Sequence, residues 1–206
     1  MIITKIEQQK KRLNRSSLYI DDVFYCGVDT QVVVSCSLKK GKEITQEELD
    51  EIERRELSHK AWDYVLRFVG IRMRSELEIR RRLKQKEYSE PLIDSLIKKS
   101  QEYNLINDDQ FAQAYVRDRV LFRNKGKRAL EFELKNKGIE KDIIQKTLSS
   151  IGEEDELGTA RLALTKKYKG NNFSDKKAYE KAMRFLAGRG FSWPTIQKAL
   201  DKKPDL

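Results

Sequence analysis

The sequence predicts a mainly α-helical protein made of three tandem three-helix repeats in an elongated, curved stack, preceded by a small N-terminal β-hairpin and α-helix. The main observation is a repeat of about fifty residues, in which large apolar residues recur at steps of 51 and then 52 positions. A helical unit of this size cannot bury its apolar face alone, so we expect the copies to stack on each other. The four recurring columns are Leu83/Leu134/Leu186, Tyr88/Ile139/Phe191, Ile93/Ile144/Ile196 and Ile97/Leu148/Leu200.

The composition supports a stack of repeats over a single globule. The chain has 206 residues, of which 38% are hydrophobic and 37% are charged. This is poor in apolar residues for a compact domain, whereas stacked thin units have more surface per residue. Disorder is not expected, because the apolar residues are periodic and only three prolines occur.

Residues 1–58 are expected to form a separate N-terminal extension. Leu18–Ile20 and Val23–Tyr25 flank the turn-like pair Asp21-Asp22, which predicts a β-hairpin. The segment Thr30–Leu38 contains three consecutive valines, and its periodicity is compatible with either a strand or a short helix.

A helix is predicted to follow the hairpin. Thr45 with Glu48 is a capping box, which opens a helix running to about Ser58. Seven acids and two bases lie between Glu43 and Glu56, and acids at a helix start complement the macrodipole.

Three repeats are predicted to follow, at residues 59–107, 108–152 and 153–206. In the first repeat, an apolar stripe from Trp62 to Val69 predicts one helix. Ser75 with Glu78 forms a second capping box, which predicts the start of a second helix, and Pro91 predicts the start of a third. The third repeat has a long polar loop at Lys169–Asp175 and a weakly apolar second helix, with the small residue Ala182 at a core position. Its packing is expected to be looser.

No enzymatic site is expected. His59 is the only histidine, so a histidine-based zinc site cannot form within one chain, and its role is expected to be structural. No phosphate-binding loop of the Walker type and no nucleophile elbow occurs. Asp108-Asp109 resembles a metal-binding pair, but its place before an apolar stripe favours helix capping. We therefore expect no metal and no cofactor.

The expected setting is the reducing cytoplasm, and the expected state is a monomer. Cys26 and Cys36 have no metal-ligand spacing and would make only a sparse disulfide framework. No signal peptide or membrane-spanning run is recognised.

The strongest functional signal is positive charge, with a formal net charge of +10. Segments 67–86 and 117–137 each contain eight bases, against two and three acids, and occupy the same part of their repeats. Stacking would place both clusters along one side, which suits a phosphodiester backbone. The predicted binding residues are Arg67, Arg72, Arg74, Arg80, Arg81, Arg82, Lys84, Lys86, Arg123, Lys125, Lys127, Arg128, Lys135 and Lys137.

Two further expectations concern these segments. The loop from Phe122 to Arg128 leads into a helix start, where exposed N–H groups would add to anion binding. For any single base, solvation of a helix or pairing with Glu76, Glu78, Glu131 or Glu133 is an equally good interpretation. Sequence-specific DNA readout is not expected, since no zinc-finger or homeodomain motif occurs.

The order of these motifs resembles the RecX family of recombination regulators over nearly the whole chain. The residues that carry the resemblance are Arg74–Ile79 with Leu83, Asn107–Ala112, Lys125–Arg128 with Leu134, Lys137–Ile139, Gly188–Ser192 with Ile196, and the hairpin followed by Leu38–Gly41. The resemblance implies three three-helix repeats, no enzymatic activity, and binding to the RecA filament on single-stranded DNA. It also implies placement in the filament groove and inhibition of strand exchange, ATP hydrolysis and co-protease activity.

Two alternatives remain. A general nucleic-acid-binding helical protein, for single-stranded and also double-stranded DNA, needs only the basic surface. The scarcity of surface aromatics expected in the basic segments argues against it, because such proteins usually stack bases on aromatic rings. A scaffold for an acidic protein would show no dependence on DNA.

Overall fold

The computed structural model describes residues 1–169, 173 and 176–200, which form three strands and ten helices. The mainly α-helical class and the N-terminal sheet are therefore as predicted. The chain divides into two compact units, Met1–Ile71 with Leu83–Leu96, and Arg72–Arg82 with Ile97–Leu206.

The first unit contains a three-stranded antiparallel sheet of order β1-β2-β3, one strand more than predicted. Its strands are β1 (Ile3–Gln9), β2 (Arg12–Ile20) and β3 (Val23–Asp29). Asp21 and Asp22 join β2 to β3 with φ of 48° and 65°. Two consecutive left-handed residues match the right-handed twist of a hairpin, and the predicted hairpin is confirmed.

The segment Thr30–Leu38, for which a strand and a short helix were both compatible with the sequence, contains the short helix α1 (Thr30–Ser35). The long helix α2 (Gln46–Ile71) follows it. The Thr45 capping box is confirmed, since Glu48 N donates to Thr45 Oγ1 and Thr45 N donates to Glu48 Oε2. The predicted end near Ser58 is wrong. No Gly or Pro interrupts the helix there, and its buried residues change face beyond that point: Glu56 is buried on one side, and Ala61 and Val65 are buried on the opposite side.

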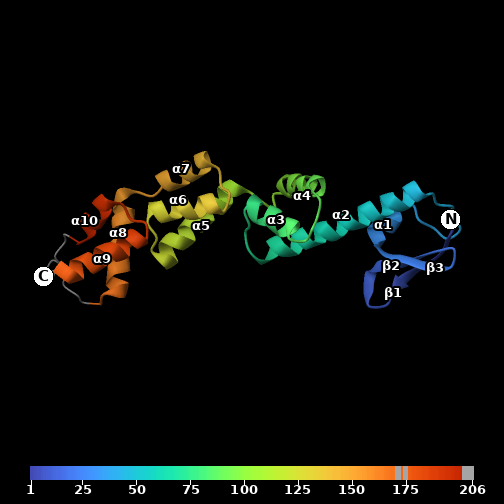
Figure 1. The fold of residues 1–206 in the computed structure, drawn as a ribbon, viewed down its shortest axis with the longest axis horizontal. Helices are drawn as coiled ribbons and strands as arrows, with labels where there is room; N and C mark the ends of the chain where they lie inside the picture. Colours follow the sequence, from blue (N-terminus) through green and yellow to red (C-terminus); the bar gives the residue numbers. More distant parts are fainter. Residues whose placement is uncertain (170–172, 174–175, 201–206) are drawn as a thin grey trace. The chain divides into compact units, whose positions relative to one another are not determined.

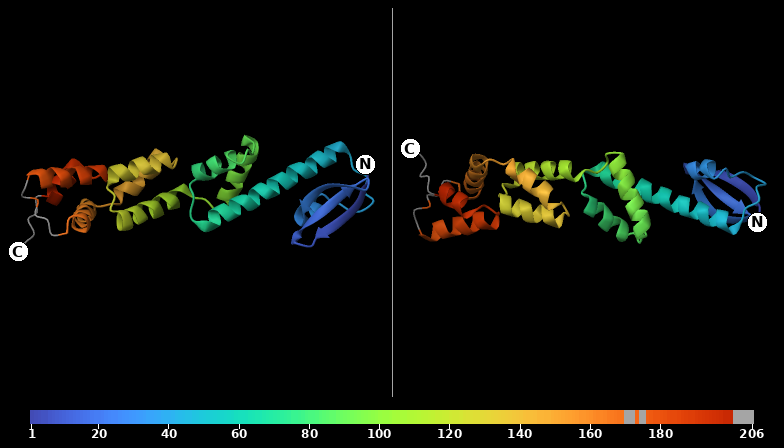
Figure 2. Two further views of the ribbon diagram at one scale, coloured as in Figure 1. Left: turned by 60° about the horizontal axis from the view of Figure 1, so that its bottom comes forward. Right: turned by 90° about the horizontal axis from the view of Figure 1, so that it is seen from above.

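A buried ion pair fixes α2 against the sheet, which lies with α1 beside the first half of this helix (Figures 1 and 2). Glu56 is 5% exposed. Its Oε1 lies 2.6 Å from Arg15 Nη2 on β2, and its Oε2 accepts from Asp29 N at 2.7 Å. His59 lies one turn further on, with Nε2 3.1 Å from Gln31 Oε1, which is the structural role expected of it.

The second unit contains two complete three-helix groups. Helices α5 (Asp108–Arg123), α6 (Lys127–Asn136) and α7 (Lys141–Ser149) share one core. Helices α8 (Glu153–Lys167), α9 (Lys176–Gly188) and α10 (Trp193–Leu200) share another. The apolar columns predicted from the repeat supply Leu134 and Ile144 to the first core, and Leu186 and Ile196 to the second.

Helices α3 (Glu76–Lys84) and α4 (Glu90–Glu102) are the remaining ones of the predicted first repeat. The looser packing expected for the third repeat is not observed among its described residues. Ala182 is fully buried, and Tyr168, Phe173 and Phe185 pack against the same cluster. The Tyr168 ring meets the rings of Phe173 and Phe185 edge to face. Most of the predicted loop 169–175 lies outside the described residues.

Candidate nucleic-acid interface

The N-terminus of α3 is capped by residues that come much later in the sequence. Glu76 N donates to Asp108 Oδ1 at 3.0 Å, and Ser75 Oγ donates to Lys137 O at 2.7 Å. Asp108 therefore caps the helix of the preceding repeat, while Asn107 caps its own helix through Gln110 N. Burial raises the pKa of Asp108 above its usual value, although the hydrogen bond from Glu76 N opposes this.

The same arrangement recurs one repeat later, at the start of α6. Lys127 N donates to Glu156 Oε1 at 3.0 Å, and Arg128 N donates to Gly190 O at 3.0 Å. Gly126 N donates to Arg189 O at 2.9 Å. The prediction that N–H groups at this helix start are open to anions is wrong, because the third repeat already occupies them.

Two predicted binding residues, Arg72 and Lys137, hold an internal carboxylate. Arg72 Nη2 lies 3.1 Å and Lys137 Nζ 2.5 Å from Glu78 Oε1. Burial raises the pKa of Glu78, but the hydrogen bonds from the two bases outweigh it, so the pKa lies below its usual value. Ser75 Oγ accepts from Glu78 N as a cap, but the carboxylate does not complete the predicted capping box because it faces these bases instead.

A second internal carboxylate, Glu133 on α6, is surrounded in the same way. Lys125 Nζ lies 3.3 Å from its Oε1, Arg119 Nε lies 3.3 Å from its Oε2, and Tyr115 donates its hydroxyl to Oε2 at 2.9 Å. Burial raises the pKa of Glu133, but the hydrogen bonds and charges of these donors lower it by more, so the pKa lies below its usual value. Lys125 thus contributes to holding α5 and α6 together as well as to the charge of the surface.

The other predicted residues are mostly exposed: Arg74, Arg80 and Lys127 are half-buried, and Arg67, Arg81, Arg82, Lys84, Lys86, Arg123, Arg128 and Lys135 are exposed. Arg80 pairs with Glu76, Lys135 with Glu131 and Lys84 with Glu90. Arg67 donates to Asp63 O, Arg81 donates to Asn136 O, Lys86 lies over the Tyr64 ring, and Arg74 and Arg82 each have a partner. Arg67, Lys84 and Lys86 belong to the first unit and the others to the second.

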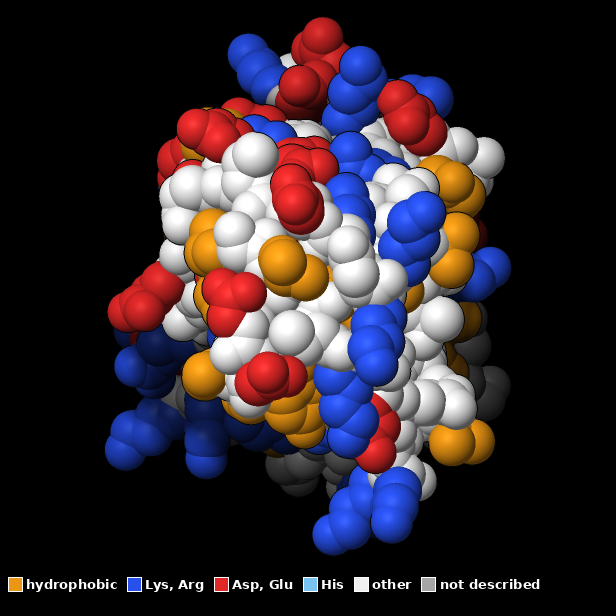
Figure 3. Space-filling view, turned by 90° about the vertical axis from the view of Figure 1, so that its right-hand side faces the viewer, with side chains coloured by type: hydrophobic (Ala, Val, Ile, Leu, Met, Phe, Trp, Pro, Cys, Tyr) orange, Lys and Arg blue, Asp and Glu red, His pale blue; other side chains and the backbone are white. Residues whose placement is uncertain are grey.

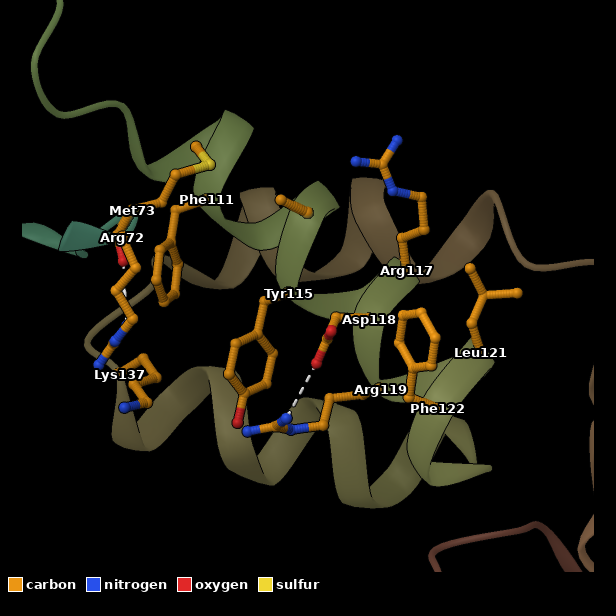
Figure 4. Close-up of a pocket in the computed structure, with 11 residues that line it drawn as sticks. Arg72, Met73, Phe111, Tyr115, Arg117, Asp118, Arg119, Leu121, Phe122 and Lys137 are labelled. Carbon is orange, nitrogen blue, oxygen red and sulfur yellow. Dashed lines mark hydrogen bonds and ion pairs between the residues drawn. The ribbon is translucent and has the colours of Figure 1, made fainter. Parts of the chain in front are cut away.

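A groove of about 570 Å³ runs along the outer side of α5 (Figure 4). Arg72, Met73 and Lys137 lie at one end, and Leu121 and Phe122 lie at the other. Between them, the Arg119 guanidinium lies over the Tyr115 ring, 4.5 Å from its centroid. The groove therefore combines cationic and apolar contacts on one surface.

The expected scarcity of surface aromatics does not hold in the second basic segment, residues 117–137. Phe122 is 73% exposed and Phe132 is 66% exposed. Phe132 lies midway between buried Leu130 and Leu134, on the opposite side of α6, so a helical projection of the sequence predicts its exposure. Phe122 projects in nearly the same direction as buried Phe111, three turns earlier, but it lies in the last turn of α5, and a projection does not predict its exposure.

Bases outside the two predicted segments also reach the surface. In the third repeat Lys166 and Lys167 end α8, and Arg189 follows α9. In the first unit, exposed bases lie on the β1–β2 turn at Lys10 and Lys11. Figure 3, which faces the end with the N-terminal sheet, shows Lys and Arg side chains in a band beside Asp and Glu side chains.

Two features bear on other classes of function. Within the described ranges, no three His, Cys, Asp or Glu side chains are grouped so as to hold a metal ion. No helix there is long and apolar enough to span a bilayer.

The fold and the surface thus define a class: a helical-repeat protein with an N-terminal sheet and many exposed arginines. Four family models together match most of the chain: the regulatory protein RecX N-terminal domain at residues 1–45, and the first, second and third RecX three-helix domains at 61–99, 107–148 and 153–200. The chain belongs to the RecX family of regulatory proteins.

Individual relatives agree with the family models. The regulatory protein RecX of Bacillus subtilis (strain 168) is 37% identical over 97% of this chain and 76% of its own length. That of Clostridioides difficile (strain 630) is 34% identical over 98% of this chain and 95% of its own. A solved structure described as the crystal structure of regulatory protein RecX superposes with a TM-score of 0.77 at 27% identity, covering 98% of this chain and 99% of that one.

Proposed function

We propose that this protein binds the RecA recombinase filament on single-stranded DNA, in its helical groove, and opposes strand exchange, ATP hydrolysis and co-protease activity. It would act as a non-enzymatic cytoplasmic monomer in the control of recombination, DNA repair and the SOS response. Membership of a family of regulatory proteins supports a role without catalysis. The observation that carries the proposal is the group of exposed arginines in the second unit, Arg81, Arg82, Arg123 and Arg128.

Arginine suits both surfaces that such a filament would present. Its planar guanidinium forms paired hydrogen bonds with phosphate and with carboxylate, and it stays charged at all working pH values. Each phosphate that is neutralised also releases counterions, which makes binding to DNA dependent on salt. A protein that contacts DNA and acidic protein together should therefore bind the filament more tightly than bare DNA.

The test is RecA-catalysed, single-strand-dependent ATP hydrolysis during titration with this protein, with binding to the single strand measured alongside. We expect suppression at protein concentrations well below those that cover the DNA. Suppression only at saturation of the DNA would contradict direct action on the filament.

The structure identifies which bases to change in this assay. Arg81 and Arg82 are exposed, so Arg81→Glu with Arg82→Glu should abolish suppression while leaving helicity intact. Arg72 and Lys137 are unsuitable, because they hold Glu78 and their loss would disturb the fold. The matched control reverses two exposed bases elsewhere in the second unit, Lys98→Glu with Lys141→Glu, and should retain suppression. Full suppression by the Arg81/Arg82 variant would refute the assignment of these residues.

The exposed rings of Phe122 and Phe132 favour a second candidate function, general binding of single-stranded nucleic acid without a filament partner. Base–aromatic stacking is the usual contribution of such rings. Equal affinity for the bare strand and for the RecA filament would support this second function over the first.

A further inference from the structure

A second hollow, of about 490 Å³, lies where the second and third repeats meet. The end of α5 and the following loop supply Phe122, Arg123, Asn124 and Lys125. Helix α8 and the end of α9 supply the opposite side, with Lys166, Lys167, Phe185 and Arg189. The hollow therefore exists only where the two repeats are packed together.

The charge of this hollow is of one sign. Five lining residues are bases, and the described residues that line it include no Asp or Glu. Lys125 reaches out to Glu133 at 3.3 Å, and Arg189 donates to the backbone oxygen of Arg123. The field inside the hollow consequently favours an anion, and low-dielectric walls concentrate that field.

Two buried donors of this hollow have no acceptor within the described chain. Asn124 is 4% exposed and adopts a left-handed conformation with φ of 48°. Its Oδ1 accepts from Lys166 Nζ at 3.2 Å, while its Nδ2 and the Nε of Arg189 are both unpaired. Buried donors without partners are costly, so an incoming oxygen ligand would offset part of this cost.

Aromatic rings accompany the bases. The Phe185 ring is already covered by cations, with Lys167 Nζ at 4.3 Å and the Arg189 guanidinium at 4.6 Å from its centroid. Phe122 stands at the rim and is 73% exposed. An exposed ring beside a group of bases is the combination that single-strand binding proteins use, in which the bases contact phosphate and the ring stacks on a nucleobase.

A purely structural explanation accounts for only part of this arrangement. Arg123 ends α5, and Lys166 and Lys167 end α8, so their charges complement the helix dipoles. Helix dipoles do not require an exposed phenylalanine next to these bases, or unpaired donors beneath them.

We propose that this hollow binds a phosphate group of single-stranded nucleic acid, with the adjoining base stacked on Phe122. This deepens the proposed function, since it rests on contact with the single strand and assigns that contact to the joint between the second and third repeats. Arg123 and Lys167 would neutralise the phosphate, because both lie on the rim as exposed bases.

The test is binding of the full chain to a short labelled oligothymidylate, followed by fluorescence anisotropy over a range of salt concentrations. Arg123→Gln with Lys167→Gln should weaken binding and lower the slope of log Kobs against log salt by about 0.7 for each lost phosphate contact. The matched control, Arg184→Gln with Lys141→Gln, removes equal charge from exposed positions outside the hollow and should change the slope less. Equal slopes for the two variants would overturn the proposal.

The stacking part is tested by comparing two exposed rings. Phe122→Leu should weaken oligothymidylate binding roughly tenfold, in the range known for losing one base–aromatic stack. Phe132→Leu, outside the hollow, should have a smaller effect. On an abasic sugar–phosphate strand the Phe122→Leu effect should vanish, while the Arg123/Lys167 effect persists. Equal losses for the two leucine variants would refute stacking at Phe122.

Two additional measurements separate the sources of phosphate and guard against misfolding. Inorganic phosphate and thymidine monophosphate are used as competitors of the oligothymidylate. Displacement of the oligothymidylate by either competitor at the same molar concentration as the strand would indicate a small-anion site and contradict the proposal. Photocrosslinking of the unchanged protein to an iodouracil strand should label the peptide containing Phe122, and labelling only elsewhere would contradict it. The Arg123/Lys167 and Phe122 variants are also tested in the RecA ATP hydrolysis assay. If they bind oligothymidylate as the unchanged protein does and still suppress hydrolysis, the proposed phosphate site is refuted but the proposed function is not.

Discussion

Replacing Gly190 by alanine should destabilise the packing of the third repeat on the second. Gly190 has φ of +82°, a conformation that an alanine adopts only with strain. An added Cβ would come within 2.7 Å of Ala129 Cα and closer still to its backbone nitrogen, so the backbone of α6 must move. That movement would stretch the hydrogen bond from Arg128 N to Gly190 O, now 3.0 Å.

The magnitude follows from these contributions. The left-handed conformation costs an alanine about 1–2 kcal/mol, and forcing atoms into a packed site costs about 1–3 kcal/mol. Weakening one backbone hydrogen bond adds about 1 kcal/mol. We therefore expect the free energy of unfolding of the second unit to fall by about 3–6 kcal/mol.

Urea denaturation followed by circular dichroism, with hydrogen exchange at the Lys127 and Arg128 amides, measures this loss. Two glycines serve as controls. Gly41 also has a positive φ, +84°, but a Cβ there meets open space, so Gly41→Ala isolates the strain. Gly188 has neither constraint, and Gly188→Ala should be neutral or stabilising. If Gly190→Ala costs no more than Gly41→Ala, the argument from close packing is wrong.

Two further predictions concern titrating groups. Glu78→Gln should cost about 2 kcal/mol at neutral pH by urea denaturation, because Arg72 and Lys137 lose a charged acceptor. The folded pKa of Glu78 is lowered, so its stabilisation is present above the unfolded pKa of about 4.3 and the difference should shrink as the pH falls below it; a constant difference would contradict this. Burial raises the pKa of Cys26 to about 11, so mass spectrometry should find it alkylated much more slowly at pH 8 in the folded than in the urea-unfolded chain.

The repeat architecture could be predicted because core burial follows sequence periodicity. Leu83, Leu134 and Leu186 were aligned by spacing alone, and all three are fully buried. Helix α2 was divided wrongly, because the change from an acidic to an apolar surface after Ser58 resembles a boundary although no residue there breaks a helix.

Contacts between distant residues could not be predicted. Asp108 was expected to cap nearby backbone, yet it caps Glu76 N, 32 positions earlier, and Glu156 caps Lys127 N, 29 positions earlier. Local patterns do not show which carboxylate will be brought to which helix start. The basic segments were identified by charge, but the roles of Lys125 and Lys137 in holding Glu133 and Glu78 depend on the packed structure.

The caps supplied from one repeat to the preceding one give the second unit a direction. The N-terminus of α6 relies on Glu156 and Gly190 of the third repeat, just as the N-terminus of α3 relies on Asp108 of the second. Shortening the chain from its C-terminal end would therefore damage the repeat that remains, by uncovering the amides of Gly126, Lys127 and Arg128. Repeats of this kind are not interchangeable modules: the first and the second are each completed by the repeat that follows.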